Sequence, residues 1–309
     1  MQVLLAQPRG FCAGVARAVE IADRALEMYG APVFVYHEIV HNGHVVGNLR
    51  SRGAVFVDDL ADVPEGSVTI FSAHGVSSAI VAEAKARKLQ VIDATCPLVT
   101  KVHLQAQRQS QRGHTVVVIG HVGHEEVEGT RGSIAGPVHV VSTVEEIEAL
   151  PMSADAPVAY VTQTTLSIDD TRDLIEALET RYPDIVGPGL DDICYATQNR
   201  QRAVVQLARK ADLIIVVGAR NSSNSNRLQE VAADHGVPAR LVEQADQLEI
   251  EWLRGVQAIG VTAGASTPEF LVREVIERLR EFGAREVREL LGLAETVHFR
   301  MPDELRRSA

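Results

Sequence analysis

The stretch LIIVVGARNSSNSN, residues 213–226, joins a short apolar run to a polar tip, and this combination decides the fold class. The run is far too short to span a bilayer. The tip is rich in Ser and Asn, which commonly cap helices, and a helical pattern follows to about His235. The stretch therefore predicts a strand, a polar tip and a helix in succession.

The same unit recurs along the whole chain. Further apolar runs lead into polar tips at Gln2–Ala6, Pro32–Tyr36, Val68–Phe71, Val91–Ile92, Thr115–Ile119, Val158–Val161 and Ala258–Val261. Helical patterns follow several of them, for example Val15–Tyr29 and Thr171–Arg181. Short apolar runs that alternate with amphipathic stretches predict an α/β fold with mostly parallel sheets covered by helices. Such sheets carry their polar sites just beyond the carboxyl ends of the strands, where every one of these tips falls.

Three isolated cysteines, Cys12, Cys96 and Cys194, divide the chain into segments of similar length. Each segment carries at least two strand–tip–helix units. We therefore expect three similar α/β lobes that pack against one another with their strand ends facing a shared centre. The predicted lobes span residues 1–96, 97–193 and 194–283, and a less regular tail follows at 284–309.

Composition and charge exclude several classes of protein. The net charge of −11 argues against general nucleic-acid binding and against an anionic membrane surface, because both need a basic face. The start MQVLLAQP lacks the basic residues and cleavage site of a signal peptide. We expect a cytoplasmic protein whose thiols stay reduced, and three cysteines cannot all pair within one chain. Metal binding or catalysis is thus favoured over disulfide bonding.

The cysteines by themselves leave the nature of their site open. A lone cysteine is often only a small buried apolar residue. Structural zinc sites usually gather cysteines in C-x-x-C pairs, which are absent from this sequence, but three cysteines and a histidine also suit zinc. Three thiolates on a cubane iron–sulfur cluster would leave one iron without a protein ligand. The spacing alone supports a metal site without choosing between these metals.

Two kinds of polar tip surround the expected centre. The loop GHVGHEEVEGT places His124 and Glu126 close together. This pattern fits three interpretations: a proton relay, a pair of metal ligands or a solvated polar loop. The tips NSSNSN, TAGASTP and TQTTLS are rich in Ser, Thr and Asn and contain no Lys or Arg. Such tips cap helices, and the same hydroxyl and N–H groups also bind anions. An anion site of this kind depends on excluding water, so we expect it to close around its ligand.

Nine motifs in series resemble one known family, the 4-hydroxy-3-methylbut-2-enyl diphosphate reductases of the non-mevalonate isoprenoid pathway. In order they are PRGFCAG, HEIVHN, FSAHGVS, DATCPLVTKVH, GHEEVEGT, TQTTLS, DDICYAT, NSSNSNRL and TAGASTP. The match runs from the first residues to the tail. Each motif is weak alone, but their order along the chain is highly specific.

The resemblance implies a trefoil around one 4Fe–4S cluster held by Cys12, Cys96 and Cys194, with one open iron. It implies that Glu126 delivers protons, that Thr164 helps to position the hydroxyl and the proton relay, and that His124 contacts the substrate. The remaining substrate contacts implied by the matching motifs are His41, His74, Thr165, Ser222, Ser223, Asn224 and Ser266.

The reaction implied by the resemblance is a reductive dehydroxylation. Two electrons and two protons convert an allylic alcohol diphosphate to water and a mixture of isopentenyl and dimethylallyl diphosphates. The fingerprint G-x-G-x-x-G of dinucleotide-binding proteins is absent from the strand–helix junctions. We therefore expect a separate electron donor, a ferredoxin or a flavodoxin.

Two alternatives remain at the level of the sequence. One is a zinc hydrolase that uses the GHVGHEE loop with one cysteine; it would be colourless, whereas a cluster protein is brown and contains acid-labile sulfide. The other is a non-enzymatic iron–sulfur sensor, which would need a DNA-binding or effector module. The sequence shows no basic helix-turn-helix pattern and no segment left over for such a module.

Overall fold

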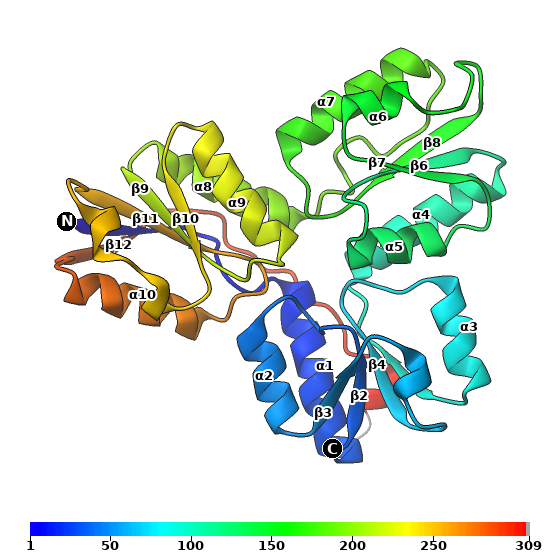
Figure 1. The fold of residues 1–309 in the computed structure, drawn as a ribbon, viewed down its shortest axis with the longest axis horizontal. Coiled ribbons are helices and arrows are strands. Elements are labelled where there is room, and N and C mark those ends of the chain that lie inside the picture. Colours follow the sequence, from blue (N-terminus) through cyan, green and yellow to red (C-terminus); the bar gives the residue numbers. More distant parts are fainter. Residues whose placement is uncertain (307–309) are drawn as a thin grey trace. The chain divides into compact units, whose positions relative to one another are not determined.

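Three parallel sheets covered by helices make up the chain in a computed structural model, which describes residues 1–306 (Figure 1). Within this part of the chain, every pair of neighbouring strands in the sheets runs parallel. The predicted α/β fold with three parallel-sheet lobes is confirmed. The last residues of the expected tail, 307–309, lie outside the described residues. The trefoil arrangement of the lobes around a centre stays a prediction.

The chain forms two compact units. The first unit contains the five-stranded sheet and comprises Met1–Val15, His41–Val45 and Tyr195–His298. The second unit contains the four-stranded and the three-stranded sheet and comprises Ala16–Val40, Val46–Cys194 and the chain from Phe299.

The five-stranded sheet has the strand order β10-β9-β11-β1-β12. Its strands are β10 (Ala239–Val242), β9 (Leu213–Val217), β11 (Ala258–Ala263), β1 (Gln2–Leu5) and β12 (Glu286–Glu289). Side chains of β9 alternate between two cores: Ile215 packs with α10 (Glu269–Glu281), and Ile214 packs with α8 (Tyr195–Ala208) and α9 (Ser223–Asp234). Helices cover both faces (Figure 1), which explains why the strand is apolar along its whole length.

The second unit holds two smaller sheets. One has the order β3-β2-β4-β5, with β3 (Ala54–Val57), β2 (Val33–Tyr36), β4 (Val68–Phe71) and β5 (Gln90–Asp93). The other has the order β7-β6-β8, with β7 (Val138–Val141), β6 (Thr115–Ile119) and β8 (Val158–Thr162). The helices between these strands are α1 (Ala13–Tyr29), α2 (Gly43–Ser51), α3 (Ser78–Ala86), α4 (Pro97–Gln111), α5 (Glu125–Gly132), α6 (Val144–Glu148) and α7 (Ile168–Arg181). Short 3-10 turns occur at Leu60–Asp62, Ala245–Gln247, Ile250–Leu253 and Asp303–Leu305.

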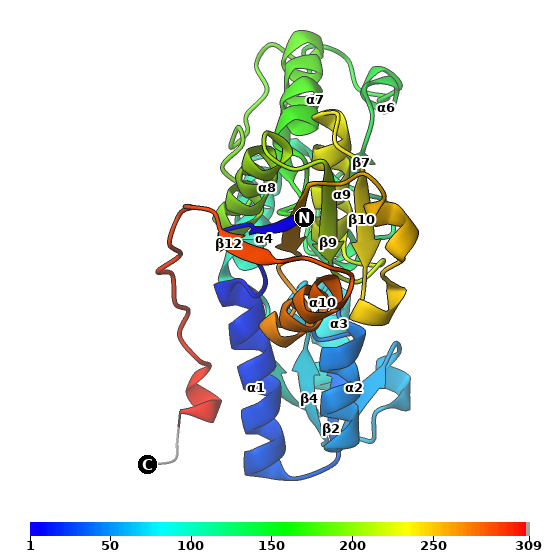
Figure 2. The same ribbon diagram turned by 90° about the vertical axis from the view of Figure 1, so that its left-hand side faces the viewer.

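The two ends of the chain differ from the predicted lobe boundaries. Strand β1, which we expected in the lobe 1–96, pairs with β11 and β12 of the five-stranded sheet (Figure 2). Strand β12 lies inside the segment that we expected to be an irregular tail. A short apolar strand has the same local pattern wherever it pairs, and only long-range packing selects its neighbours. The boundaries near residues 97 and 194 stay a prediction.

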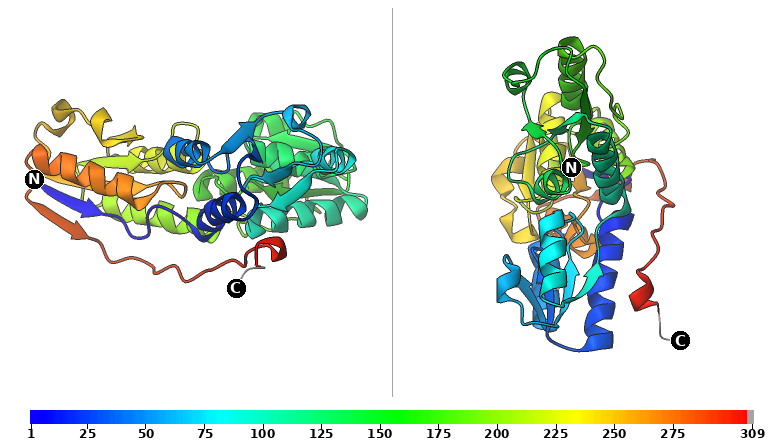
Figure 3. Two further views of the ribbon diagram at one scale, coloured as in Figure 1. Left: turned by 90° about the horizontal axis from the view of Figure 1, so that it is seen from below. Right: turned by 90° about the vertical axis from the view of Figure 1, so that its right-hand side faces the viewer.

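Residues 290–298 follow β12 without forming a helix or a strand (Figure 3). The first of them is still tied to the sheet, because the Leu290 N–H donates to the Leu5 carbonyl at 2.9 Å. Among the described residues, none of the helices has both the length and the apolar character that a membrane span requires.

The position of β1 inside the sheet yields a stability prediction. Leu4 is buried in the core beneath α8 and α9. Leu4→Ala should lower the free energy of unfolding by about 2–5 kcal/mol, because it leaves a cavity. The matched control is Leu104→Ala on α4, since Leu104 is 56% exposed; it should cost no more than about 0.5 kcal/mol. Chemical denaturation followed by circular dichroism measures both, and equal small losses would contradict the central position of β1.

Candidate active site

Each of the three cysteines stands directly before a helix. Cys12 precedes α1, Cys96 is the N-cap residue of α4, and Cys194 precedes α8. All three are half-buried. Backbone N–H groups at a helix start can donate to a sulfur atom held there. This donor set suits thiolate-bound iron.

Cys12 is held at the carboxyl end of β11, within the first unit. Its N–H donates to the Ala265 carbonyl at 3.1 Å, and its Sγ accepts from the Val15 N–H at 3.5 Å. Gly10 has a φ of 66°, and a Cβ there would lie 3.1 Å from the Thr267 carbonyl. The glycine of RGFCAG therefore permits the turn that brings Cys12 to the sheet edge.

Cys96 and Cys194 belong to the second unit. The Cys96 N–H donates to the Ala73 carbonyl at 3.0 Å, which places Cys96 beyond the end of β4. The Cys194 N–H donates to the Thr164 carbonyl at 3.1 Å, beyond the end of β8. Arg17 donates to the carbonyls of Ala94 and Thr95, just before Cys96. The backbone that carries each thiol is thus fixed by its neighbouring strand tip.

An ion pair between a half-exposed lysine and a buried aspartate joins the segments that carry these two cysteines. Lys101, on α4, donates to the Asp191 carbonyl at 2.9 Å and lies 3.4 Å from Oδ1 of Asp192. The side chain of Asp192 is fully buried, and its Oδ2 accepts from the Thr162 N–H at 3.4 Å. Burial raises the pKa of Asp192, and the charge of Lys101 opposes this rise. Lys101 therefore links the helix after Cys96 to the loop before Cys194.

Glu126 and Thr164 form a buried pair in the same unit. The Thr164 N–H donates to Oε1 of Glu126 at 2.6 Å, and the Thr164 hydroxyl donates to Oε2 at 3.1 Å. Glu126 is 4% exposed and Thr164 is 5% exposed. Both carboxylate oxygens of Glu126 thus accept hydrogen bonds from a single residue, Thr164 of the tip TQTTLS. A carboxyl group and a hydroxyl in this geometry can pass a proton between them.

Two histidines accompany this pair. His124 caps α5: its Nδ1 accepts from the Glu126 N–H at 3.1 Å, so a neutral His124 carries its proton on Nε2. His74 lies 2.8 Å from a carboxylate oxygen of Glu125, and the rings of His74 and His124 are 6.1 Å apart. The second unit thus gathers His74, His124, Glu126 and Thr164 from three separate motifs.

Thr165 is tied to the GHVGHEE loop by a residue that sequence reasoning missed. Gln163 is 2% exposed. Its Nε2 donates to the Thr165 hydroxyl at 2.9 Å, while its Oε1 accepts from the His121 N–H at 3.1 Å. Gln163 therefore joins the two tips through its side chain. The only signal in the sequence was its place inside TQTTLS.

The first unit gathers the predicted neutral donors. Ser222 caps α9, so the capping role that the sequence also allowed is present. Asn224 is 4% exposed; its Oδ1 accepts from the Ala265 N–H at 2.9 Å, and its Nδ2 has no hydrogen-bond partner within the described part of the chain. The Ser266 hydroxyl donates to the His41 carbonyl at 2.9 Å. Ser223 begins α9, beside Ser222 and Asn224. A buried N–H group with no protein partner is a natural contact for an anionic ligand.

Glycines make room for these donors. A Cβ at Gly218 would lie 2.2 Å from the Ser225 hydroxyl oxygen, and one at Gly264 would lie 2.0 Å from it. Both glycines follow strands of the five-stranded sheet, after β9 and β11. The start of α9 can therefore pack directly against the strand ends.

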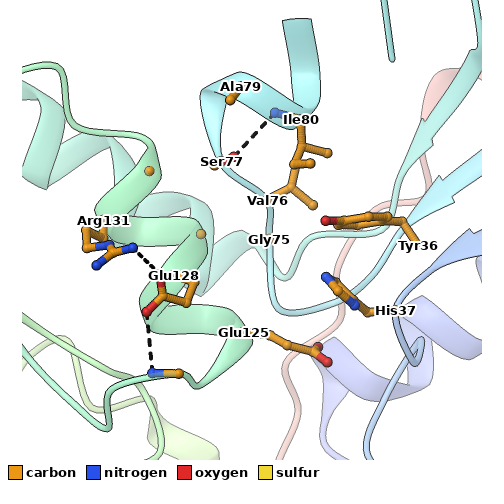
Figure 4. Close-up of a pocket in the computed structure, with 13 residues that line it drawn as sticks. Tyr36, His37, Gly75, Val76, Ser77, Ala79, Ile80, Glu125, Glu128 and Arg131 are labelled. Carbon is orange, nitrogen blue, oxygen red and sulfur yellow. Dashed lines mark hydrogen bonds and ion pairs between the residues drawn. The ribbon is translucent and has the colours of Figure 1, made fainter. Parts of the chain in front are cut away.

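A cavity of about 470 Å³ opens in the second unit beside Glu125 (Figure 4). Its wall includes Tyr36, His37, Val76, Glu128 and Arg131, and Glu128 pairs with Arg131 at 2.7 Å. The lining contains neither Glu126 nor Thr164. This cavity is thus a neighbour of the Glu126–Thr164 pair and not the space that the pair faces.

Comparison with known sequences gives matches over the whole chain. The model of the LytB protein family matches residues 3–280. The chain is 56% identical over 308 residues to 4-hydroxy-3-methylbut-2-enyl diphosphate reductase 2 of Bradyrhizobium diazoefficiens, with 100% of both chains covered. It is 53% identical to the 4-hydroxy-3-methylbut-2-enyl diphosphate reductase of Zymomonas mobilis, covering 99% of this chain and 90% of that protein.

Solved structures give the same relationship. The E-1-hydroxy-2-methyl-but-2-enyl-4-diphosphate reductase from Plasmodium falciparum matches with a TM-score of 0.95 and 38% identity, over 98% of this chain and 96% of that chain. A second structure is that of (E)-4-hydroxy-3-methyl-but-2-enyl diphosphate reductase, the terminal enzyme of the non-mevalonate pathway. It matches with a TM-score of 0.65 and 33% identity, over 91% of this chain and 100% of that chain.

The Lys101–Asp192 pair predicts a pH-dependent loss of stability. A raised pKa in the folded chain means that the fold binds the Asp192 proton more tightly than the unfolded chain does, so stability falls as the pH rises through that range. Without Lys101 this loss is larger. Lys101→Ala should therefore lower the free energy of unfolding by about 1–3 kcal/mol at neutral pH. The loss should shrink at acid pH, where Asp192 is protonated.

Urea denaturation at several pH values measures this effect. The control is Arg24→Ala, which breaks an exposed pair with Glu20 on α1 and should cost less than about 1 kcal/mol. A Lys101→Ala loss that is the same at acid and neutral pH would rule out Asp192 as the partner.

Proposed function

This chain belongs to the LytB family, and we propose that it reduces (E)-4-hydroxy-3-methylbut-2-enyl diphosphate to isopentenyl diphosphate and dimethylallyl diphosphate with release of water. It is an oxidoreductase that performs the last step of the non-mevalonate isoprenoid pathway. The resemblance seen in the nine motifs is confirmed by relatives that match along the full length. Membership of this family favours the reductase over both the zinc hydrolase and the iron–sulfur sensor.

The family depends on iron–sulfur chemistry, and Cys12, Cys96 and Cys194 are the proposed ligands of one 4Fe–4S cluster. Their support is the shared position between a strand tip and a helix, where a loop can present each sulfur to a common centre. When bound through three thiolates, such a cluster supplies electrons one at a time and offers one iron as a Lewis acid. The proposed electron donor is a ferredoxin or a flavodoxin, and the proposed location is the cytoplasm.

The buried Glu126–Thr164 pair is the observation that carries the proposal for catalysis. When Glu126 is protonated, its Oε2–H donates to the Thr164 hydroxyl, which reverses the hydrogen bond that the carboxylate accepts. The Thr164 hydroxyl then donates its own proton toward the departing oxygen of the substrate. Protonation turns that oxygen into water, a far better leaving group than hydroxide. The second bond, from the Thr164 N–H to Oε1, holds the carboxyl group in this orientation.

The diphosphate is bound at a distance from the reacting carbon. Ser222, Ser223, Asn224 and Ser266 are its proposed contacts, with support from the buried Asn224 N–H that lacks a protein partner. His41, His74, His124 and Thr165 complete the proposed substrate contacts. Neutral donors in a water-excluded site bind an anion strongly, because the local dielectric is low. This binding energy orients the hydroxyl end of the substrate.

Glu126→Gln tests the proton donor. The amide keeps the size of the carboxyl group but has no acidic proton, so turnover should fall by roughly 10²–10⁴-fold. The iron content and the affinity for substrate should stay close to those of the parent protein. A matched control is Glu128→Gln on the same helix, where the carboxylate pairs with Arg131 and has no proposed role. Near-normal turnover of Glu126→Gln would remove Glu126 from the mechanism.

Cys194→Ser tests the cluster ligands. An alcohol is a poor ligand for this metal centre, so the anaerobically purified variant should be colourless or nearly so. Iron and acid-labile sulfide per chain measure the loss directly, and circular dichroism checks that the fold is kept. Iron and sulfide at the parent level would show that Cys194 is not a ligand.

A further inference from the structure

Arg200 is the largest side chain that is fully buried within the described part of the chain. It lies on α8, in the first unit, and its guanidinium faces the backbone before Cys12. Nη2 donates to the Gly10 carbonyl at 2.7 Å and to the Phe11 carbonyl at 3.3 Å, and Nε donates to the Gly10 carbonyl at 3.1 Å. A further bond joins Nη1 to the Ala196 carbonyl at 2.9 Å.

The charge of Arg200 is balanced by Glu295, from the segment after β12. Nη1 of Arg200 lies 3.1 Å from Oε1 of Glu295, and Nη2 lies 3.3 Å from Oε2. Asn199 donates to the same Oε1 at 3.1 Å. A buried cation needs such a counter-ion, because an isolated charge in the interior is costly.

The segment that carries Glu295 runs close to the residues that lead to Cys12. Arg9 pairs with Glu289 at 2.6 Å. A Cβ at Gly292 would lie only 1.8 Å from the Gln7 carbonyl oxygen, so the two backbones pass each other at a glycine. Glu289 and Gly292 thus lie against residues that lead to Cys12, and Glu295 is linked to the same stretch through Arg200.

A guanidinium suits this arrangement better than an ammonium group. Its planar fork directs donors to three carbonyls and a carboxylate at once, whereas a lysine presents a single point charge. Arg200 is not among the residues proposed to contact the substrate. Its burial is therefore explained by its hydrogen bonds to the backbone carbonyls of Gly10 and Phe11.

We infer that Arg200 is a positioning residue for Cys12, and that Glu295 makes the segment after β12 part of the Cys12 loop. The guanidinium fixes the carbonyls of Gly10 and Phe11, and this fixes where the Cys12 thiol emerges at the end of β11. The importance of this for the cluster rests on the proposed role of Cys12 as a ligand. The positioning of the thiol does not depend on that role.

The test uses the full-length chain and measures the reactivity of each cysteine separately. Cluster-free protein is treated with a thiol-alkylating reagent, and mass spectrometry follows the rate at Cys12, Cys96 and Cys194. In Glu295→Gln and in Arg200→Lys, alkylation of Cys12 should accelerate several-fold while the other two rates stay unchanged. Anaerobically reconstituted samples of the same variants should hold less iron and sulfide than the parent protein.

Arg181→Lys is the matched control. Arg181 also donates to two backbone carbonyls, those of Glu148 and Leu150, but it lies in the second unit and away from the cysteine motifs. Its substitution should leave all three alkylation rates and the iron content unchanged.

Two results would overturn the inference. One is an unchanged Cys12 rate in Glu295→Gln, the milder of the two variants. The other is an equal acceleration at all three cysteines, which indicates general unfolding. A parent protein that takes up no iron, with the Cys12-specific effect intact, would instead contradict the proposed function and leave the positioning role standing.

Discussion

Each of the three cysteines is set at the start of a helix, and the chemistry proposed for this protein depends on that placement. Within each sheet the parallel strands end at one edge, so the chain turns there and enters a helix. The residue at that junction lies beside the first backbone N–H groups of the helix. Cys12, Cys96 and Cys194 occupy this position. This shared setting cannot be read from their spacing in the sequence.

Under the proposed function, the two units contribute different chemistry to the reaction. The first unit offers neutral donors at the ends of β9 and β11, where glycines let α9 approach the strands closely. The second unit offers a carboxyl group whose two oxygens are both bonded to Thr164, next to a histidine whose Nδ1 accepts a backbone hydrogen bond. The proposed anion binding and the proposed proton transfer thus depend on separate arrangements. Each arrangement is held by hydrogen bonds within its own unit, which is the preorganisation that catalysis needs.

Local patterns predicted the central strands and the polar tips. Strands such as β9 are buried on both faces, so they are apolar throughout and stand out in the sequence. Four strands were missed: β3, β7, β10 and β12. All four lie at a sheet edge and are only partly buried, so their apolar pattern is weaker. The expectation that β1 belongs to the lobe 1–96 missed its pairing with β11, because pairing with a strand more than two hundred residues away leaves no local trace.

In the candidate site, too, the sequence predicted some residues and missed others. The residues named from the motifs lie at strand ends or helix starts, as expected for functional tips on a parallel sheet. The supporting residues were not predicted. Gln163 joins two tips, the Lys101–Asp192 pair joins α4 to the loop before Cys194, and Arg200 with Glu295 holds the backbone before Cys12. A positioning side chain acts through contacts distant in sequence. Such a residue looks like any other polar residue until its partners are known.

Anaerobic turnover of (E)-4-hydroxy-3-methylbut-2-enyl diphosphate tests the central claim most directly. The full-length protein, loaded with iron and sulfide, is given a chemical reductant, and the products are identified by mass spectrometry. The reductase function predicts isopentenyl and dimethylallyl diphosphates, formed only when reductant and cluster are both present. Cluster-loaded protein that leaves the substrate unchanged would contradict it.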